Sequence, residues 1–273
     1  MIAAMLAARA GRAETISAGR VAAVVNRNVS ALRAGPSYLL ILVSGFFEPL
    51  LYLLSIGMGV GALVGDLTMP DGRTMPYAAF VAPAMLAASA MAGAVAETTF
   101  NFFFKLKYSK TFDAVLATPV RPIEVALGEL TWAMARSSLY TGVFLGVMVA
   151  FGLTGPGWAL AAFPATVLIG LAFGAAGMAI CTVLRGWQDF DLLNTGMFAL
   201  VFFSGSFSPV QSYPAAVEIV IGLTPLYHAV ELLRGLTTGA VAVGLLGHAG
   251  YLAAMTAAGL LIAGRRLRRL ACK

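Results

Sequence analysis

The chain has 273 residues, of which 60% are hydrophobic and 11% charged, and its mean hydropathy is +0.88. Too few polar side chains are present to cover a water-soluble globule, so the composition excludes a soluble enzyme and predicts one integral membrane domain. The net charge of +6 would suit a nucleic-acid partner, but membrane proteins also carry excess Lys and Arg at their cytoplasmic face, so the location of the charges must decide.

Two smaller features of the sequence bear on the class of protein. Cys181 lies in an apolar run and Cys272 near the C-terminus, so their positions indicate neither a disulfide nor a metal site. Arginines interrupt the N-terminal segment, which lacks the compact apolar core of a secretory signal, so we expect this segment to stay on the protein.

A helix is expected before the first apolar stretch. Apolar residues recur there at helical spacing, with arginines between them: Val21, Val24, Val25, Val29 and Leu32, and Arg20, Arg27 and Arg33. This pattern predicts an amphipathic helix lying in the membrane interface. The alternative is a frayed, charged N-terminal tail.

Six apolar stretches approach the roughly 20 helical residues that cross a bilayer. They run from Tyr38 to Gly61, Tyr77 to Phe100, Ala133 to Leu153, Ala159 to Leu184, Leu192 to Phe207 and Ala240 to Ala263. The predicted fold is therefore an all-α integral membrane protein with six transmembrane helices and both termini on one side.

The Lys and Arg residues are divided unevenly between the two faces of this topology. Of the 18, sixteen fall on one face, and only Arg73 and Arg234 fall on the other. The positive-inside rule makes the basic face cytoplasmic, so both termini are expected in the cytoplasm.

Glu48 lies near the centre of the first predicted span, in Phe46-Phe47-Glu48-Pro49. Burying a charge at that depth costs several kcal/mol on some scales, so such residues usually face a cavity or a partner. The residue is either a polar point on a substrate path or lateral gate, or a protonated or hydrogen-bonded packing residue near the kink at Pro49.

The segment from Lys105 to Gly128, between the second and third spans, combines basic and aromatic residues. Helical spacing puts Phe112, Val115 and Leu116 on one face of a short amphipathic helix that ends near Pro119. Such a helix either docks into a groove on a soluble partner or lies on the lipid surface.

Two apolar segments after the fifth span are too short to cross. Ala215 to Gly222 and Leu226 to Leu236 are bracketed by prolines and carry Glu218, Glu231 and Arg234. They predict two short outer helices or a re-entrant hairpin, which is tolerated where protein or a cavity covers the backbone.

Motifs for catalysis are missing from the sequence. It contains no Gly-Lys-Ser or Gly-Lys-Thr phosphate loop and no Gly-x-Ser-x-Gly elbow. His228 and His248 have no Cys or His beside them in the sequence, so no metal site is expected.

His228, Glu231 and Arg234 near the outer face could serve acid–base roles, which keeps a lipid-modifying membrane enzyme as the alternative hypothesis. A passive channel is a third, less supported class, because no polar stripe accompanies the lone acid.

The ordered series of motifs resembles the permease subunits of type-2 ABC exporters, in the branch with nodulation lipooligosaccharide and daunorubicin-type drug exporters. The segments that carry the resemblance are Phe46-Phe47-Glu48-Pro49, Phe80-Val81-Ala82-Pro83, Lys105 to Pro119, Trp187-Gln188-Asp189-Phe190-Asp191, Phe207-Ser208-Pro209 and Thr224 to Gly235. Each piece is weak alone, but together they span most of the chain.

The resemblance implies a cytoplasmic arm with an interfacial helix (1–37), a six-span domain (38–264) and a basic cytoplasmic tail (265–273). It implies a multi-pass protein of the cell membrane that forms half of an export path for an amphiphilic, lipid-linked or drug-like molecule. The chain needs no cofactor of its own, because ATP and Mg²⁺ act in two copies of a separate ABC ATPase subunit. Membrane lipid and a second permease chain, identical or a sister, are the other partners, and nucleic acid is not one.

The resemblance also assigns residues to three regions. The substrate path or gate, along the first and fifth spans, contains Phe47, Glu48, Tyr52, Phe203 and Phe207. The coupling helix that touches the ATPase contains Phe112, Asp113, Val115, Leu116, Thr118 and Pro119. The outer helices contain Tyr227, His228, Glu231 and Arg234. The substrate itself is not readable, because a hydrophobic path and a lipid-facing surface use the same side chains.

Overall fold

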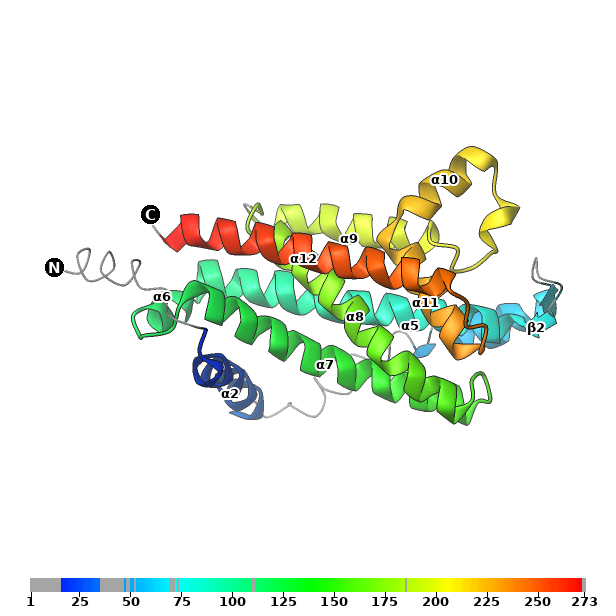
Figure 1. Cartoon of the computed structure of the whole chain (residues 1–273), viewed down its shortest axis with the longest axis horizontal. Coiled ribbons are helices and arrows are strands. Elements are labelled where there is room, and N and C mark those ends of the chain that lie inside the picture. The colour runs from blue at the N-terminus through cyan, green and yellow to red at the C-terminus, as the bar shows by residue number, and fades with distance from the viewer. Residues whose placement is uncertain are drawn as a thin grey trace.

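A computed structural model of the chain describes residues 16–34, 47, 50–51, 53–68, 72, 74–109, 111–184 and 186–271, apart from a few side chains. Most of these residues are helical, and the long helices run side by side along the molecule (Figure 1). The fold therefore agrees with the expected all-α membrane protein.

Four helices in the described part are long and apolar enough to cross a bilayer. They are the continuous helix Tyr77–Tyr108, α7 (Pro122–Ala150), α8 (Pro156–Cys181) and α12 (Gly244–Ala271). The first of these consists of α5 (Tyr77–Ala96) followed by the π-helical turns η2 (Glu97–Asn101) and η3 (Phe104–Tyr108). A protein that crosses the membrane several times follows from these lengths.

The third predicted span begins too late. The helix α7 starts at Pro122 rather than near Ala133, since proline suits the first helical position and Glu124 Oε2 accepts a hydrogen bond from the Arg121 backbone N–H at 2.9 Å. The charges of Glu124 and Glu129 do not end the helix, because basic side chains from other segments pair with both carboxylates.

The fifth predicted span is also corrected. Helix α9 (Gln188–Phe202) has 15 residues, about 22 Å at 1.5 Å per residue, and it begins before the predicted Leu192 and ends before the predicted Phe207. Phe203 leaves helical geometry, with φ −105° and ψ 47°, and Gly205 then turns the chain with φ +67°. Half of the first predicted span lies outside the described residues, and its second half includes η1 (Leu53–Val60) and the start of α4 (Gly61–Val64).

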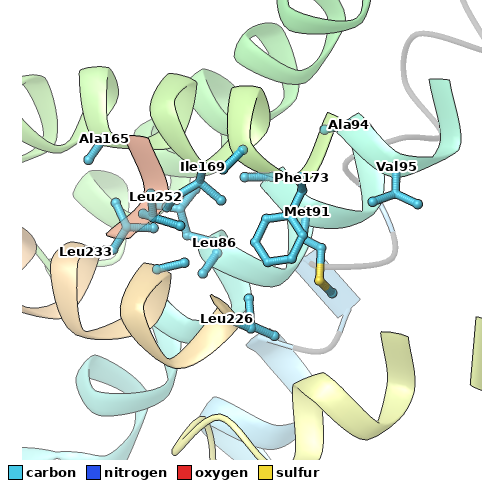
Figure 2. Packing of buried hydrophobic residues seen from close by; sticks show 14 of the residues in the cluster. Leu86, Met91, Ala94, Val95, Ala165, Ile169, Phe173, Leu226, Leu233 and Leu252 are labelled. Carbon is cyan, nitrogen blue, oxygen red and sulfur yellow. The ribbon is translucent and has the colours of Figure 1, made fainter. Parts of the chain in front are cut away.

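Helix α5 is the centre of the bundle and is buried along most of its length. Alanine, serine and glycine are frequent in it, and such small residues let neighbouring helices approach closely. Figure 2 shows Leu86 and Met91 of this helix packed among residues of three other helices: Ile169, Phe173, Leu226, Leu233 and Leu252.

Shorter elements lie at the two ends of the bundle (Figure 1). At one end are α2 (Ala18–Ala34), α6 (Thr111–Leu116) and the last turns of α12. At the other end are the antiparallel hairpin of β1 (Asp66–Thr68) and β2 (Thr74–Pro76), the turn η4 (Val210–Ser212), α10 (Ala215–Leu223) and α11 (Pro225–Thr237). Helices α10 and α11 form where two short outer helices were predicted, and they meet at an angle of 85°.

Helix α2 forms where an amphipathic helix was predicted, but part of its apolar face contacts protein. Val24 is buried against Gly128 of α7, and a Cβ atom built at Gly128 would lie 2.6 Å from the Val24 Cβ. Glycine is therefore required at this crossing of α2 and α7.

Candidate translocation path and coupling region

Helix α9 is the most exposed of the long helices beside α5 and packs on the bundle along one face only. Phe190 is its one buried residue, whereas large apolar side chains such as Leu192, Phe198 and Phe202 are exposed. An exposed apolar helix is ordinary on a membrane protein, and one face of α9, with Leu193, Met197 and Val201, packs against the core.

Aromatic side chains hold the first turn of α9. The Phe190 ring lies 4.1 Å from that of Phe100 and 5.2 Å from that of Phe103, measured between centroids. Trp187 joins them, with its ring 5.5 Å from Phe190. Aromatic pairs at these separations add to burial, so this end of α9 is fixed to the α5–η3 helix.

The other end of α9 is held through the turn that follows it. The Phe202 and Phe207 rings are 5.7 Å apart, and the Tyr77 hydroxyl donates a hydrogen bond to the Phe207 carbonyl oxygen at 3.2 Å. The helix is thus attached at both ends, and the space beside its middle is open.

A cavity of about 580 Å³ lies between α5, α9 and the Phe207 turn. Val60 of η1 borders it, as do Ser89 and Gly93 of α5 and Asn194 of α9. The lining is mostly apolar, and the volume is that of a pocket for a drug-sized molecule or part of a lipid.

Ser89 is the unusual residue in this cavity. Its side chain is buried, and in the described part of the chain its Oγ has no hydrogen-bond partner. A buried hydroxyl without a partner costs about 1–3 kcal/mol, so it calls for an explanation in a native structure. Asn194 supplies an amide from the facing helix, and together the two side chains could bind a hydroxyl or amide of a ligand.

A second cavity, of about 780 Å³, lies on the other side of α9, toward α8 and α12. Phe173 and Gly177 of α8 and Met255 of α12 border it. Both cavities share Met91 of α5 and Met197 of α9. Methionine adapts its shape easily, so these two side chains can repack toward either cavity.

The predicted path residues are only partly brought together. Phe207 lines the smaller cavity, whereas Phe203 and Phe47 are about half exposed. Glu48 and Tyr52 lie outside the described residues. Ser89 and Asn194 were missed, because isolated polar residues in apolar spans do not stand out in one sequence.

A short helix, α6, forms where the coupling helix was predicted, and Phe112 is buried in it. Phe112 is 3% exposed, and its ring packs against Phe102 with centroids 4.8 Å apart. This buried ring is not available to a partner and instead anchors α6 to the helix before it. Thr118 and Pro119 are exposed, and Val115 packs partly against the core. The side chains of Asp113 and Leu116 lie outside the described part.

Buried ion pairs near α6 were also missed. Glu124 and Glu129 of α7 pair with Arg20 and Arg27 of α2, and Lys105 also pairs with Glu129. Farther along the bundle, Arg136 pairs with Glu97. Acidic residues inside the apolar stretch after Pro122 indicate buried ion pairs. Their basic partners are far away in the sequence, so spacing alone could not identify them.

The Arg234 side chain on α11 is buried and bonded to groups from several elements. It is 6% exposed, its guanidinium lies 4.0 Å from the centre of the Phe80 ring, and it donates to the Gly205 carbonyl oxygen at 2.9 Å. Glu231 pairs with it one turn earlier. Arg234 therefore fastens the turn after α9 to α11 and α5.

His228 has a partner that the sequence did not predict. Its Nδ1 lies 2.8 Å from Nδ1 of His248 on α12, and its ring stacks on Tyr251 at 4.0 Å. Tyr227 meets both imidazoles edge-on. In the described residues no third His, Cys or carboxylate joins the pair into a metal-binding group.

Comparisons with known proteins agree with this architecture. The ABC-2 type transporter family matches residues 20–237. Nodulation protein J of Rhizobium leguminosarum bv. trifolii is 33% identical over 207 residues, which are 75% of this chain and 77% of that protein. Nodulation protein J of Rhizobium meliloti (strain 1021) is 33% identical over 226 residues, or 81% and 83% of the two chains. The protein of that name from Rhizobium leguminosarum bv. viciae is 31% identical over 224 residues, or 81% and 84%.

The match spans α2 to the end of α11 and so includes the α5–η3 helix, α6, α9 and both cavities. Members of such transporters provide the membrane passage and are not themselves enzymes. The chain therefore belongs to the ABC-2 type transporter family as a multi-pass membrane subunit.

Proposed function

We propose that this chain is the permease subunit of an ATP-driven exporter and forms half of the passage for an amphiphilic, lipid-linked or drug-like molecule. Family membership supports the transport role. The observation that carries the path is the apolar cavity between α5 and α9, with Ser89 and Asn194 in its wall. The relatives named Nodulation protein J, together with the motif resemblance, favour a cargo that combines an apolar chain with hydrogen-bonding groups.

The full assembly in this proposal has two permease chains and two ABC ATPase subunits. The second permease is an identical copy or a sister chain, and ATP and Mg²⁺ bind to the ATPases. Each permease has six spans, with α2 in the membrane interface and both termini in the cytoplasm. The grouping of α2, α6 and the basic end of α12 at one end of the bundle supports this orientation.

Replacing Ser89 by alanine should weaken recognition of polar cargo without destabilising the protein. In the described chain the Ser89 hydroxyl makes no hydrogen bond that the substitution would remove. The free energy of unfolding should therefore be unchanged or slightly higher. The apparent affinity for a fluorescent N-acyl amphiphile, measured by its transport into proteoliposomes, should fall about three- to tenfold, because one hydrogen bond is lost. An O-acyl ester with the same chain should be affected less.

Ser137→Ala is the matched control for this test, because Ser137 is equally buried but donates to the Ala90 carbonyl oxygen and does not border the cavity. It should leave the preference between the two probes unchanged. An equal loss for both probes in Ser89→Ala would contradict a recognition role.

A charge on the exposed side of α6 should prevent coupling to the ATPase. Ala114 of α6 and Ala117, in the turn that follows α6, are exposed, so glutamate at either position is compatible with folding. Burying an unpaired carboxylate in an interface costs several kcal/mol, so transport-coupled ATP hydrolysis in proteoliposomes should drop by about tenfold or more.

Ser30→Glu places the same charge on an exposed position of α2 and should keep activity near that of the wild type. If the Ala114→Glu and Ala117→Glu variants both still assembled with the ATPase and transported normally, α6 would not be the coupling helix. Phe112 is unsuitable for this test, because removing its buried ring would disturb the fold as well.

The alternative of a lipid-modifying enzyme has less support. His228 faces His248, and Arg234 faces Phe80 and Gly205, so the residues do not converge on one reacting atom. Turnover of a lipid by the purified chain without any ATPase would favour the enzyme.

A further inference from the structure

Lys105 and Glu129 tie together the two segments that carry α6. Lys105 lies in η3, just before α6, and Glu129 lies at the start of the third turn of α7, the helix after α6. The Lys105 Nζ is 2.6 Å from Glu129 Oε2, and the Glu129 side chain is 4% exposed. This ion pair closes the base of the η3–α6–α7 hairpin.

Helix α2 joins the same carboxylate from a third direction. Arg27 Nη2 donates to Glu129 Oε1 at 2.6 Å and to Asn28 Oδ1 at 3.0 Å. Lys105 Nζ also donates to Asn28 Oδ1 at 3.0 Å, and Asn28 is 5% exposed. The four side chains form a closed ring, which we call the Glu129 ring: Arg27, Asn28, Lys105 and Glu129.

A second carboxylate on α7 binds α2 differently. Glu124 is 0% exposed, and its oxygens accept from the Ser17 backbone N–H at 2.9 Å, from Arg20 Nε at 2.8 Å and from the Arg121 backbone N–H at 2.9 Å. These donors come from the start of α2 and from the residue before α7. Glu124 therefore anchors the first turn of α2 and has no bond to η3.

The Glu129 ring is less completely bonded than the Glu124 site. Two cations share one carboxylate, and within the described chain Arg27 Nη1 and Asn28 Nδ2 are buried without a hydrogen-bond partner. A network with spare donors is not optimised for stability. It can exchange hydrogen bonds when one member is displaced, because another donor is already beside the vacated oxygen.

We propose that Glu129 is a positioning residue that transmits displacement of α6 to α2 and α7. The proposal rests on the proposed role of α6 as the contact with an ATPase. When α6 moves, η3 carries Lys105 with it, and the shared carboxylate carries the displacement to Arg27. The ion pairs are then needed for coupling more than for stability.

The first test uses the full chain with its candidate ATPase in proteoliposomes. Glu129→Gln should lower the number of cargo molecules moved per ATP hydrolysed by about fivefold or more, a usual size for coupling between sites, while ATP hydrolysis continues. Glu124→Gln is the matched control, because it makes the same chemical change five positions earlier on α7. It should loosen α2 but leave the transport-to-hydrolysis ratio near that of the wild type.

Lys105→Met should reproduce the Glu129→Gln effect. The double variant should be no worse than either single variant, since both remove the same connection. If hydrolysis and transport fell in proportion in Glu129→Gln, or if both stayed at the wild-type level, the positioning role would be overturned.

A second test needs no ATPase and so separates this proposal from the proposed function. Hydrogen–deuterium exchange of the full chain in lipid nanodiscs should increase in residues 104–120 and in α2 for Glu129→Gln. For Glu124→Gln it should increase in α2 alone. An unchanged exchange rate in either segment of Glu129→Gln would overturn the link. Failure of the wild type to transport with the ATPase would refute the proposed function and leave this test to decide the link.

Discussion

Replacing Arg234 by methionine is expected to lower the free energy of unfolding by about 3–5 kcal/mol, the usual result of breaking a buried ion pair. Arg234 is almost fully buried, and its removal leaves Glu231 without its partner and the Gly205 carbonyl oxygen without a donor. It also removes the guanidinium that lies over the Phe80 ring. Denaturation in mixed micelles, followed by circular dichroism, would measure the loss.

Arg266→Met is the control for this substitution, because Arg266 is exposed on α12 and its replacement removes a charge without opening the core. We expect a change within about 0.5 kcal/mol there. Adding Glu231→Gln to Arg234→Met should recover part of the loss, since no carboxylate then remains unpaired. A loss below 1 kcal/mol for Arg234→Met would mean that the turn after α9 is held mainly by its other contacts.

Gly259→Ala should be nearly as damaging, although it adds only one methyl group. A Cβ atom at Gly259 would lie 2.6 Å from the Ala175 carbonyl carbon and 2.9 Å from its oxygen. These are backbone atoms of α8, so α8 and α12 would have to separate. Overpacking typically costs about 1–3 kcal/mol and more where backbone must shift, so we expect at least about 3 kcal/mol.

Gly250→Ala provides the comparison on the same helix, because nothing lies within 4 Å of a Cβ atom at Gly250. There alanine should be neutral or stabilise α12 by up to about 1 kcal/mol, since it is the better helix former. Thermal unfolding in one detergent would rank the two variants. Similar midpoints for both would show that α8 and α12 are not packed closely at Gly259.

The arrangement of α9 links these stability arguments to transport. Arg234 fastens the turn at one end of α9, and the aromatic residues around Phe190 fasten the other. Cavities flank the helix between these two attachments. A permease in which α9 shifts between them would change the size of the path while its ends stay attached.

Some predictions were accurate because a bilayer leaves the chain few choices. In hydrocarbon every backbone N–H and C=O must bond within the protein, so a long apolar stretch becomes a helix. The helix beginning at Tyr77, the two short helices around the bend at Thr224 and the helix at Thr111–Leu116 were all expected from local sequence. The start of α7 at Pro122 was not expected, because the basic side chains that pair with Glu124 and Glu129 come from distant segments.

Helical character, several membrane crossings and the family resemblance were thus readable from hydropathy, charge distribution and short motifs, since each depends on neighbours in the chain. Pairings were not. The contact of His228 with His248, the bonds of Glu129 to Lys105 and Arg27, and the burial of Phe112 depend on which helix faces meet. Helices with apolar residues on all sides carry little sequence signal for their rotation, so only the packed bundle decides which of their few polar groups come together.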